Sequence, residues 1–151
     1  MQHGLFFEDF ELGKTYYTER KTITETDVVT FVGNYCYSEP LFMDWEYVKN
    51  ETPFEKPIAP GMLTVSMADG LSILSGIIHR TGMALLGMEV TIKAPVFIGD
   101  TISVEIETLS KRETKKEDRG IITWLHRIVN QKGETVIEYK VTRMVKRRLE
   151  E

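Results

Sequence analysis

One short stretch of the chain, residues 36–44, concentrates the side chains that could transfer a proton. Tyr37, Glu39 and Asp44 lie there within eight positions, among aromatic neighbours. A carboxylate or a phenol held beside a substrate can act as a general acid or base, and loss of solvent among aromatic rings favours a carboxyl group's neutral form. By this reasoning Glu39, two positions from Tyr37, is a possible general base. The alternative for Glu39 is a structural role, capping or pairing within the loop.

The start of a long apolar stretch, residues 61–79, offers a second kind of chemistry. Gly61 and Met62 directly follow Pro60. A helix beginning here has unpaired backbone N–H groups and the positive end of its dipole at this point, an arrangement that holds a carbonyl oxygen. A glycine keeps that space free of a side chain. A proline early in a helix also has an ordinary structural explanation, because its missing N–H costs nothing there.

The spacing of apolar residues predicts the elements that must hold these groups. Residues 61–79 are apolar or small on every side of a helix, which is typical of a helix in the interior of a domain. The second half of the chain alternates apolar and polar residues, which predicts half-buried strands. The expected elements are a strand over 14–23, a helix over 25–34 capped by Thr24, an aromatic loop over 35–43, a short helix starting at 44–47, the helix over 61–79, and strands over 88–93, 102–107, 121–129 and 135–145. This order predicts an α+β domain whose antiparallel sheet is packed on one face by a central helix.

Length and composition limit the possible functions. The 151 residues are 42% hydrophobic and 28% charged, which is typical of one globular domain, residues 1–151, that folds without a metal or disulfide. Lys and Arg number 19 against 23 Asp and Glu, and the resulting charge of −4 argues against nucleic-acid binding. The lone Cys36 and three scattered histidines predict a reducing, cytoplasmic location and no metal site. We expect no membrane association, because no leader and no apolar run of bilayer length is present.

Four segments, taken in order, resemble the MaoC-like hydratases and dehydratases of the hot-dog superfamily. They are residues 7–14, residues 24–31, residues 57–64 with the sequence Pro-Ile-Ala-Pro-Gly-Met-Leu-Thr, and residues 94–101 with the sequence Ala-Pro-Val-Phe-Ile-Gly-Asp-Thr. The similarity runs from about Phe7 to Arg147. It implies a hot-dog fold, in which the sheet wraps around the central helix. It also implies a homodimer or larger homo-oligomer that holds its ligand in a tunnel between subunits.

The resemblance further implies binding of acyl thioesters, either of coenzyme A or of an acyl carrier protein. Coenzyme A would then be part of the substrate, and no separate cofactor is expected. The family's catalytic motif reads Gly-Asp-x-Asn-Pro-x-His-x-Asp. When its proline is set on Pro40, Tyr37 stands at its first Asp, Glu39 at its Asn, Phe42 at its His and Asp44 at its last Asp. The resemblance therefore implies an altered acid/base site, with Glu39, Tyr37 and Asp44 as candidate catalytic residues in place of the usual pair and Phe42 beside the substrate.

Two positions on the apolar helix complete the candidate site. Gly61 and Met62 would hold the thioester oxygen. Ser66 resembles the helix serine that supports the motif's Asp in the family, although a small packing residue explains it equally well. Three functions remain open: a hydratase or dehydratase acting on 2-enoyl or 3-hydroxyacyl thioesters, a non-catalytic acyl-CoA-binding subunit, and an acyl-CoA thioesterase. The last is suggested by Asp69, the one carboxylate inside the helix.

Overall fold

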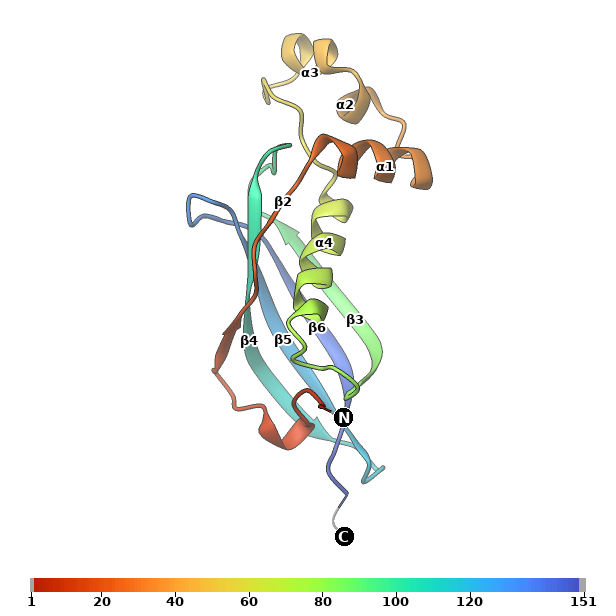
Figure 1. The fold of residues 1–151 in the computed structure, drawn as a ribbon, viewed down its shortest axis with the longest axis vertical. Coiled ribbons are helices and arrows are strands. Elements are labelled where there is room, and N and C mark those ends of the chain that lie inside the picture. The colour runs from red at the N-terminus through yellow and green to blue at the C-terminus, as the bar shows by residue number, and fades with distance from the viewer. Residues whose placement is uncertain (1, 150–151) are drawn as a thin grey trace.

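A computed structural model describes residues 2–149 of the chain; Met1, Glu150 and Glu151, at the ends of the expected 1–151 domain, lie outside the described residues. A long antiparallel sheet curves around helix α4 (Gly61–Leu74), and three shorter helices lie beyond the start of α4 (Figure 1). This is the predicted α+β arrangement. No helix among residues 2–149 has the length and apolar character needed to cross a membrane.

The six-stranded sheet has the order β1-β4-β5-β6-β3, and β2 also pairs with β4. Strands β4, β5 and β6 follow one another along the chain and pair as antiparallel neighbours, while β3 pairs with β6 at one edge. All four strands predicted in the second half of the chain are present. The strands are β1 (Thr15–Tyr17), β2 (Lys21–Thr22), β3 (Gly82–Ile92), β4 (Thr101–Glu113), β5 (Arg119–Val129) and β6 (Thr135–Lys146).

The predicted strand over 14–23 is wrong in one respect, because the chain forms two short strands there. Between β1 and β2, the side-chain oxygen of Thr18 accepts the backbone N–H of Val104 at 2.9 Å. In a continuous strand a backbone carbonyl would accept the N–H of Val104, but here the Thr18 side chain accepts it. The interruption separates β1 from β2, and both still pair with β4.

The elements before α4 begin largely where the sequence predicts. After a single 3₁₀ turn, η1 (Phe7–Asp9), and the two short strands comes helix α1 (Glu25–Tyr35). Thr24 and Asp27 cap α1 reciprocally, because each side chain accepts the other's backbone N–H, at 3.1 and 2.9 Å. The expected aromatic loop contains one more turn, α2 (Pro40–Met43), before α3 (Trp45–Glu51).

Helix α4 starts at Gly61 as predicted but ends at Leu74, so the expected extension to residue 79 is wrong. Gly76 adopts a left-handed conformation with φ of 79° directly after the capping Ser75. Glycine takes this conformation without steric cost and commonly ends helices. The chain then turns back toward β3 through residues 75–81.

One side of α4 and one face of the sheet form the core. Strands β4 and β5 alternate buried and partly exposed residues, as half-buried strands should. The opposite side of α4 is open in the single chain, since Met62, Ser66, Gly70 and Ile73 are exposed. The expectation that this helix is enclosed on every side is therefore wrong for one chain. The core includes Leu63, Val65, Ala68 and Leu71 of α4 and Ile106, Ile122, Trp124, Ile128, Tyr139 and Val141 of the sheet.

Strand β3 departs furthest from the sequence prediction. All of its residues are exposed, including the apolar Leu85, Met88, Val90 and Ile92. The prediction of a half-buried strand is wrong here because β3 is an edge strand that pairs only with β6 and is covered by no other element of the described chain. Its apolar residues remain available to a neighbour.

Candidate functional site

Helix α4 begins with unpaired backbone amides. The carbonyl of Pro60, the N-cap residue, accepts the backbone N–H of Thr64 at 3.1 Å and its hydroxyl at 3.2 Å. Within residues 2–149, the N–H groups of Gly61, Met62 and Leu63 have no acceptor. The dipole of a 14-residue helix adds partial positive charge at the same point. The tip of α4 therefore has the donors that the predicted binding of a carbonyl oxygen at Gly61 and Met62 requires.

A cleft of about 360 Å³ adjoins this tip. Gly61 lines it together with apolar side chains, among them Phe42, Phe54, Ile92 and Ile137. A Cβ atom at Gly61 would lie 3.2 Å from Cδ1 of Ile92, so even a small side chain there would crowd the wall of the cleft. The structure thus brings together Phe42 and Gly61, which the sequence singled out separately.

The same cleft has almost no ionisable lining. Lys93 is the only titratable side chain along it among the described residues. Its Nζ lies 3.0 Å from Oε1 of Glu138, and this ion pair occupies the ammonium group. Any proton transfer at the cleft must therefore use a group from outside this lining.

Tyr37 packs against one of the aromatic rings in this lining. Its half-buried ring contacts Phe31 and Phe42, with centroid separations of 4.9 and 6.1 Å. The Tyr37 hydroxyl has no hydrogen-bond partner within the described chain. Tyr37 therefore contacts a ring that lines the cleft but does not line the cleft itself.

The two carboxylates of the loop have different surroundings. Glu39 is exposed at the N-cap of α2 and its side chain makes no capping bond, so the expected enclosure by aromatic rings is wrong for the single chain. Oδ1 of Asp44 accepts the backbone N–H of Tyr47 at 3.0 Å and thereby caps α3. The structure gives Asp44 a helix-capping role, at the start of the short helix that the sequence predicted from 44–47.

A larger groove of about 670 Å³ lies between α1 and the α2–α3 segment. Asp44 and apolar residues such as Val29 and Trp45 line it. Phe42 borders both this groove and the cleft at the α4 tip. A side chain in that position controls the width of both openings.

Ser66 lies on the exposed side of α4, one turn after Met62. Its hydroxyl donates to the carbonyl of Met62 at 2.8 Å. It makes no hydrogen bond to residues 36–44 in the described chain, so the expected support of that loop is absent there. Its small size leaves the exposed face of α4 open.

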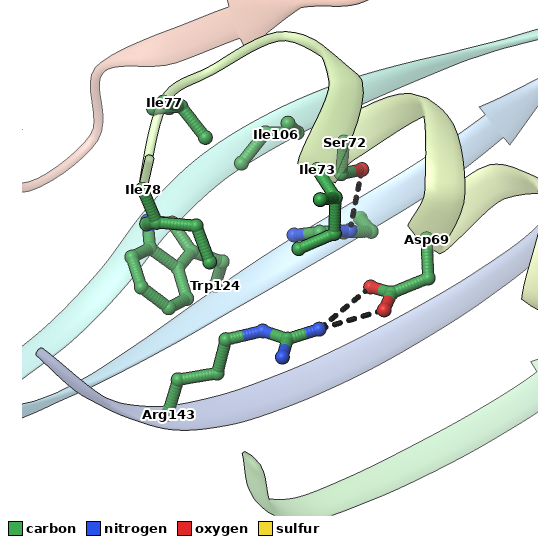
Figure 2. A pocket seen from close by; sticks show the side chains of 9 residues that line it. Asp69, Ser72, Ile73, Ile77, Ile78, Ile106, Trp124 and Arg143 are labelled. Atoms are coloured by element: carbon green, nitrogen blue, oxygen red, sulfur yellow. Dashed lines mark hydrogen bonds and ion pairs between the residues drawn. The ribbon is translucent and has the colours of Figure 1, made fainter. Parts of the chain in front are cut away.

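Sequence reasoning missed a polar cluster that crosses from α4 to the sheet. Nη2 of Arg143 lies 2.9 and 2.7 Å from the two carboxylate oxygens of Asp69 (Figure 2). The Tyr139 hydroxyl lies 3.4 Å from Oδ1 of Asp69 and 2.6 Å from Nδ1 of His126. The Ser72 hydroxyl lies 3.4 Å from Nδ1 of His126. The available signal was the alternation of β6, which puts Tyr139 and Arg143 on the face that carries its buried residues.

Burial sets the protonation of this cluster. Burial lowers the pKa of His126 to about 4, because an imidazolium would lose its solvation there. The Asp69 carboxylate opposes this shift, and the Arg143 guanidinium adds to it. Burial likewise raises the pKa of the Tyr139 phenol, and the negative charge of Asp69 adds to that shift. At neutral pH the cluster is therefore one ion pair joined to a neutral imidazole and a neutral phenol. Among residues 2–149, no group of three or more His, Cys, Asp or Glu side chains is placed to hold a metal ion.

Comparison with known proteins gives a consistent result. The family model described as "MaoC like domain" matches residues 9–129. The (R)-specific enoyl-CoA hydratase of Aeromonas caviae is 37% identical over 94 residues, which are 62% of this chain and 65% of that protein. Protein MaoC of Klebsiella aerogenes is 34% identical over 119 residues, or 76% of this chain and only 33% of that protein. The (R)-specific enoyl-CoA hydratase of Rhodospirillum rubrum is 29% identical over 140 residues and is matched along 91% of its length, with 93% of this chain covered.

Solved structures agree on the architecture. An Archaeoglobus protein described as a monoamine oxidase regulatory protein superimposes with a TM-score of 0.90 at 32% identity, covering 98% of both chains. The MaoC-like dehydratase of Rhodospirillum rubrum gives 0.88 at 28% identity, covering 97% of this chain and all of that one. A Mycobacterium tuberculosis protein described as having a double hot-dog fold gives 0.86 at 17% identity, with 98% of this chain and 46% of that chain covered. The predicted hot-dog fold is confirmed.

Proposed function

The chain belongs to the MaoC-like domain family, and from that premise we propose that it adds water to, or removes water from, 2-enoyl and 3-hydroxyacyl groups carried as coenzyme A thioesters. The observation that carries the proposal is the tip of α4, whose unpaired amides adjoin an apolar cleft of about 360 Å³. Named relatives include two (R)-specific enoyl-CoA hydratases and a 3-hydroxybutyryl-CoA dehydratase. Those activities belong to the relatives, and they set the reaction class that we propose here.

In this proposal the α4 tip binds the thioester oxygen. Hydration of a 2-enoyl thioester drives negative charge onto that oxygen as water attacks the β carbon. The amides of Gly61 and Met62 would stabilise this charge, and each such donor is typically worth a factor of about 10²–10³ in rate. Phe42, which lines the cleft, would pack against the carbon atoms next to the thioester.

Tyr37 is our first candidate for proton transfer. A hydration needs one group to take a proton from water and one to deliver a proton to the α carbon. The unpartnered phenol of Tyr37 suits delivery, since it lies next to Phe42 at the cleft. Glu39, two positions away on the same loop, would take the proton from water. Asp44 is the weaker alternative, because its carboxylate already caps α3.

The test is hydration of crotonyl-CoA and longer 2-enoyl-CoA thioesters, followed as the loss of conjugated absorbance. We expect Tyr37→Phe to lower kcat by about 10²–10⁴, the usual effect of losing a general acid. Tyr35→Phe is the matched control, because Tyr35 is 65% exposed and its ring contacts the same Phe31 at 5.1 Å. If no enoyl-CoA is hydrated although calorimetry shows that the thioesters bind, the hydratase proposal fails.

A non-catalytic acyl-CoA-binding role is the second candidate. It is favoured by the cleft lining, where the single titratable side chain of the described residues, Lys93, is already paired with Glu138. This role predicts that saturated and 2-enoyl thioesters bind equally well and that neither is consumed. Turnover that Glu39→Gln abolishes would exclude it.

The thioesterase alternative has no comparable support. Asp69 is bound by Arg143 and lies eight residues beyond Gly61, which is about 12 Å along the helix axis. A carboxylate in that position is engaged and distant from a thioester carbonyl at the α4 tip. Release of free thiol that disappears in Asp69→Asn would restore this alternative.

We also propose that a second copy of this chain completes the site by docking along β3. The strand offers an unpaired edge and a row of exposed apolar side chains, which soluble proteins generally cover. The exposed side of α4, including Met62 and Ile73, would be covered in the same step. Light scattering on the purified protein should give twice the mass of one chain or a higher multiple.

A further inference from the structure

A cleft of about 350 Å³, separate from the one at the α4 tip, lies between the end of α4 and the start of β3. Its ionisable lining within residues 2–149 is entirely basic and consists of His79, Arg80 and Arg143. The remaining walls are apolar and include Ile73 and Met83. A cleft of this kind suits a ligand that combines an anionic group with a hydrocarbon chain.

Arg143 is held at this cleft through one nitrogen only. Its Nη2 binds both oxygens of Asp69, as Figure 2 shows. Its Nε and Nη1 have no hydrogen-bond partner in the described chain, and neither atom is sealed from solvent. A guanidinium has five N–H groups, so about three remain, one on Nε and two on Nη1, and Nη1 can donate to a ligand carboxylate as Nη2 does to Asp69.

The surrounding cluster fixes the guanidinium in place. The Arg143 side chain is only 13% exposed, and its partner Asp69 is itself 3.4 Å from the Tyr139 hydroxyl. Low exposure strengthens an ionic hydrogen bond relative to bulk water, and a fixed donor loses less entropy when a ligand binds. Arg143 is thus a preorganised donor whose Nε and Nη1 N–H groups have no partner within residues 2–149.

The exposed side of α4 connects this cleft with the helix tip. Small residues, Ser66 and Gly70, lie between Met62 and Ile73 on that side, and a Cβ built on Gly70 meets no atom within 4 Å. Asp69, which holds Arg143, is eight residues from Gly61, or about 12 Å along the axis. An acyl chain of medium length lying along this open strip would span that distance.

We propose that Arg143 binds a carboxylate at the far end of the acyl chain, so that the preferred substrates are thioesters of medium-chain dicarboxylic acids. The inference rests on the proposed function, because it places the thioester at the α4 tip. A second copy docked along β3 would cover this cleft, because residues of that strand line it, and we expect the strip to be covered in the same step. The enclosed guanidinium would then select a charged chain end over a methyl group.

The test compares saturated thioesters by calorimetry with the full-length protein. Sebacoyl-CoA carries the distal carboxylate, decanoyl-CoA is its uncharged match, succinyl-CoA is too short to reach Arg143, and coenzyme A alone carries only the phosphates. We expect sebacoyl-CoA to bind about ten-fold or more tightly than decanoyl-CoA, from hydrogen bonds between charged groups. Arg143→Met should abolish that preference. Arg127→Met is the matched control, because Nη2 of Arg127 also binds one carboxylate, that of Glu107, at 2.9 Å. Arg127 lies on β5 between two buried residues, and its own side chain is on the other face of the strand.

Each outcome has a definite meaning. Equal binding of sebacoyl-CoA and decanoyl-CoA by the unaltered protein refutes the inference without any variant, while hydration of 2-enoyl-CoA would still support the proposed function. Failure of every thioester to bind refutes both. If Arg143→Met weakens coenzyme A alone as much as sebacoyl-CoA, the anion recognised is a phosphate of the carrier, and the carboxylate assignment is wrong.

Discussion

His126 should make the stability of this protein depend on pH in a range where few other groups titrate. Burial lowers the pKa of this imidazole from 6.5 to about 4 in the folded chain. The unfolded chain restores the ordinary value, so between these two values the unfolded state binds a proton that the folded state does not. The stabilisation from neutral His126 is therefore complete above pH 6.5 and is lost as the pH falls toward 4.

The size of this loss follows from the difference between the two pKa values. A factor of ten in proton affinity corresponds to about 1.4 kcal/mol, so the complete loss is roughly 3 kcal/mol, of which about 2 kcal/mol should be gone by about pH 5. The side chain is 4% exposed, so solvent screening does not reduce this value substantially. Asp9 and Asp27 have pKa values held below their ordinary range by hydrogen bonds, so their contribution is lost only at lower pH.

The assay is urea unfolding at a series of pH values between about 7.5 and 5, at one fixed protein concentration because an oligomer's stability depends on concentration. The unaltered protein should lose about 2 kcal/mol over this range. His126→Gln should be less stable at neutral pH but nearly independent of pH over the same range. Equal pH dependence in both proteins, or an NMR titration of His126 with its midpoint above about pH 6, would refute the reasoning.

Three further predictions concern packing, capping and assembly. Gly120→Ala should destabilise the fold by about 1–3 kcal/mol, because a Cβ there would overlap the ring of Phe7. Gly87→Ala should cost little, because its Cβ would meet no atom within 4 Å. Thermal unfolding of the two variants measures the difference. Asp44→Ala should lower the free energy of unfolding by about 1 kcal/mol, because the cap of α3 is lost. Asp44→Asn keeps a side-chain oxygen and should restore most of that stability. If both variants stay folded but lose hydratase activity, Asp44 acts in catalysis. Val90→Lys should convert the oligomer to monomers by placing a charge in the apolar row of β3, and an unchanged mass by light scattering would contradict docking along that strand.

Several features followed from the sequence because they depend on neighbouring residues. Thr24 and Asp27 are three positions apart and cap the first helix by themselves, so its start was predictable. The start of α4 at Gly61 and the alternation of β4 were equally local, and the ordered motif segments indicated the hot-dog fold. The C-terminal end of α4 was not predicted, because the apolar pattern continues past Gly76, where the backbone turns left-handed.

The candidate site was predictable only in part. The resemblance to the family motif indicated Tyr37, Glu39 and Asp44, but whether each side chain is stacked, exposed or used as a cap depends on how the 36–44 loop folds. The tertiary structure alone showed that Phe42 and Gly61 line one cleft and that Phe42 also borders the neighbouring groove. Such proximity is not encoded in any local spacing.

The sequence by itself determined the periodicities, and with them the order and type of the main elements, because helices and strands repeat over a few residues. Only the tertiary structure decided which apolar faces stay uncovered, since the exposure of β3 depends on its being an edge strand. The same holds for the pairing of Asp69 with Arg143, which lie 74 positions apart in the chain. Contacts between residues so distant in sequence arise when strands and helices pack, and no pattern within either segment specifies them.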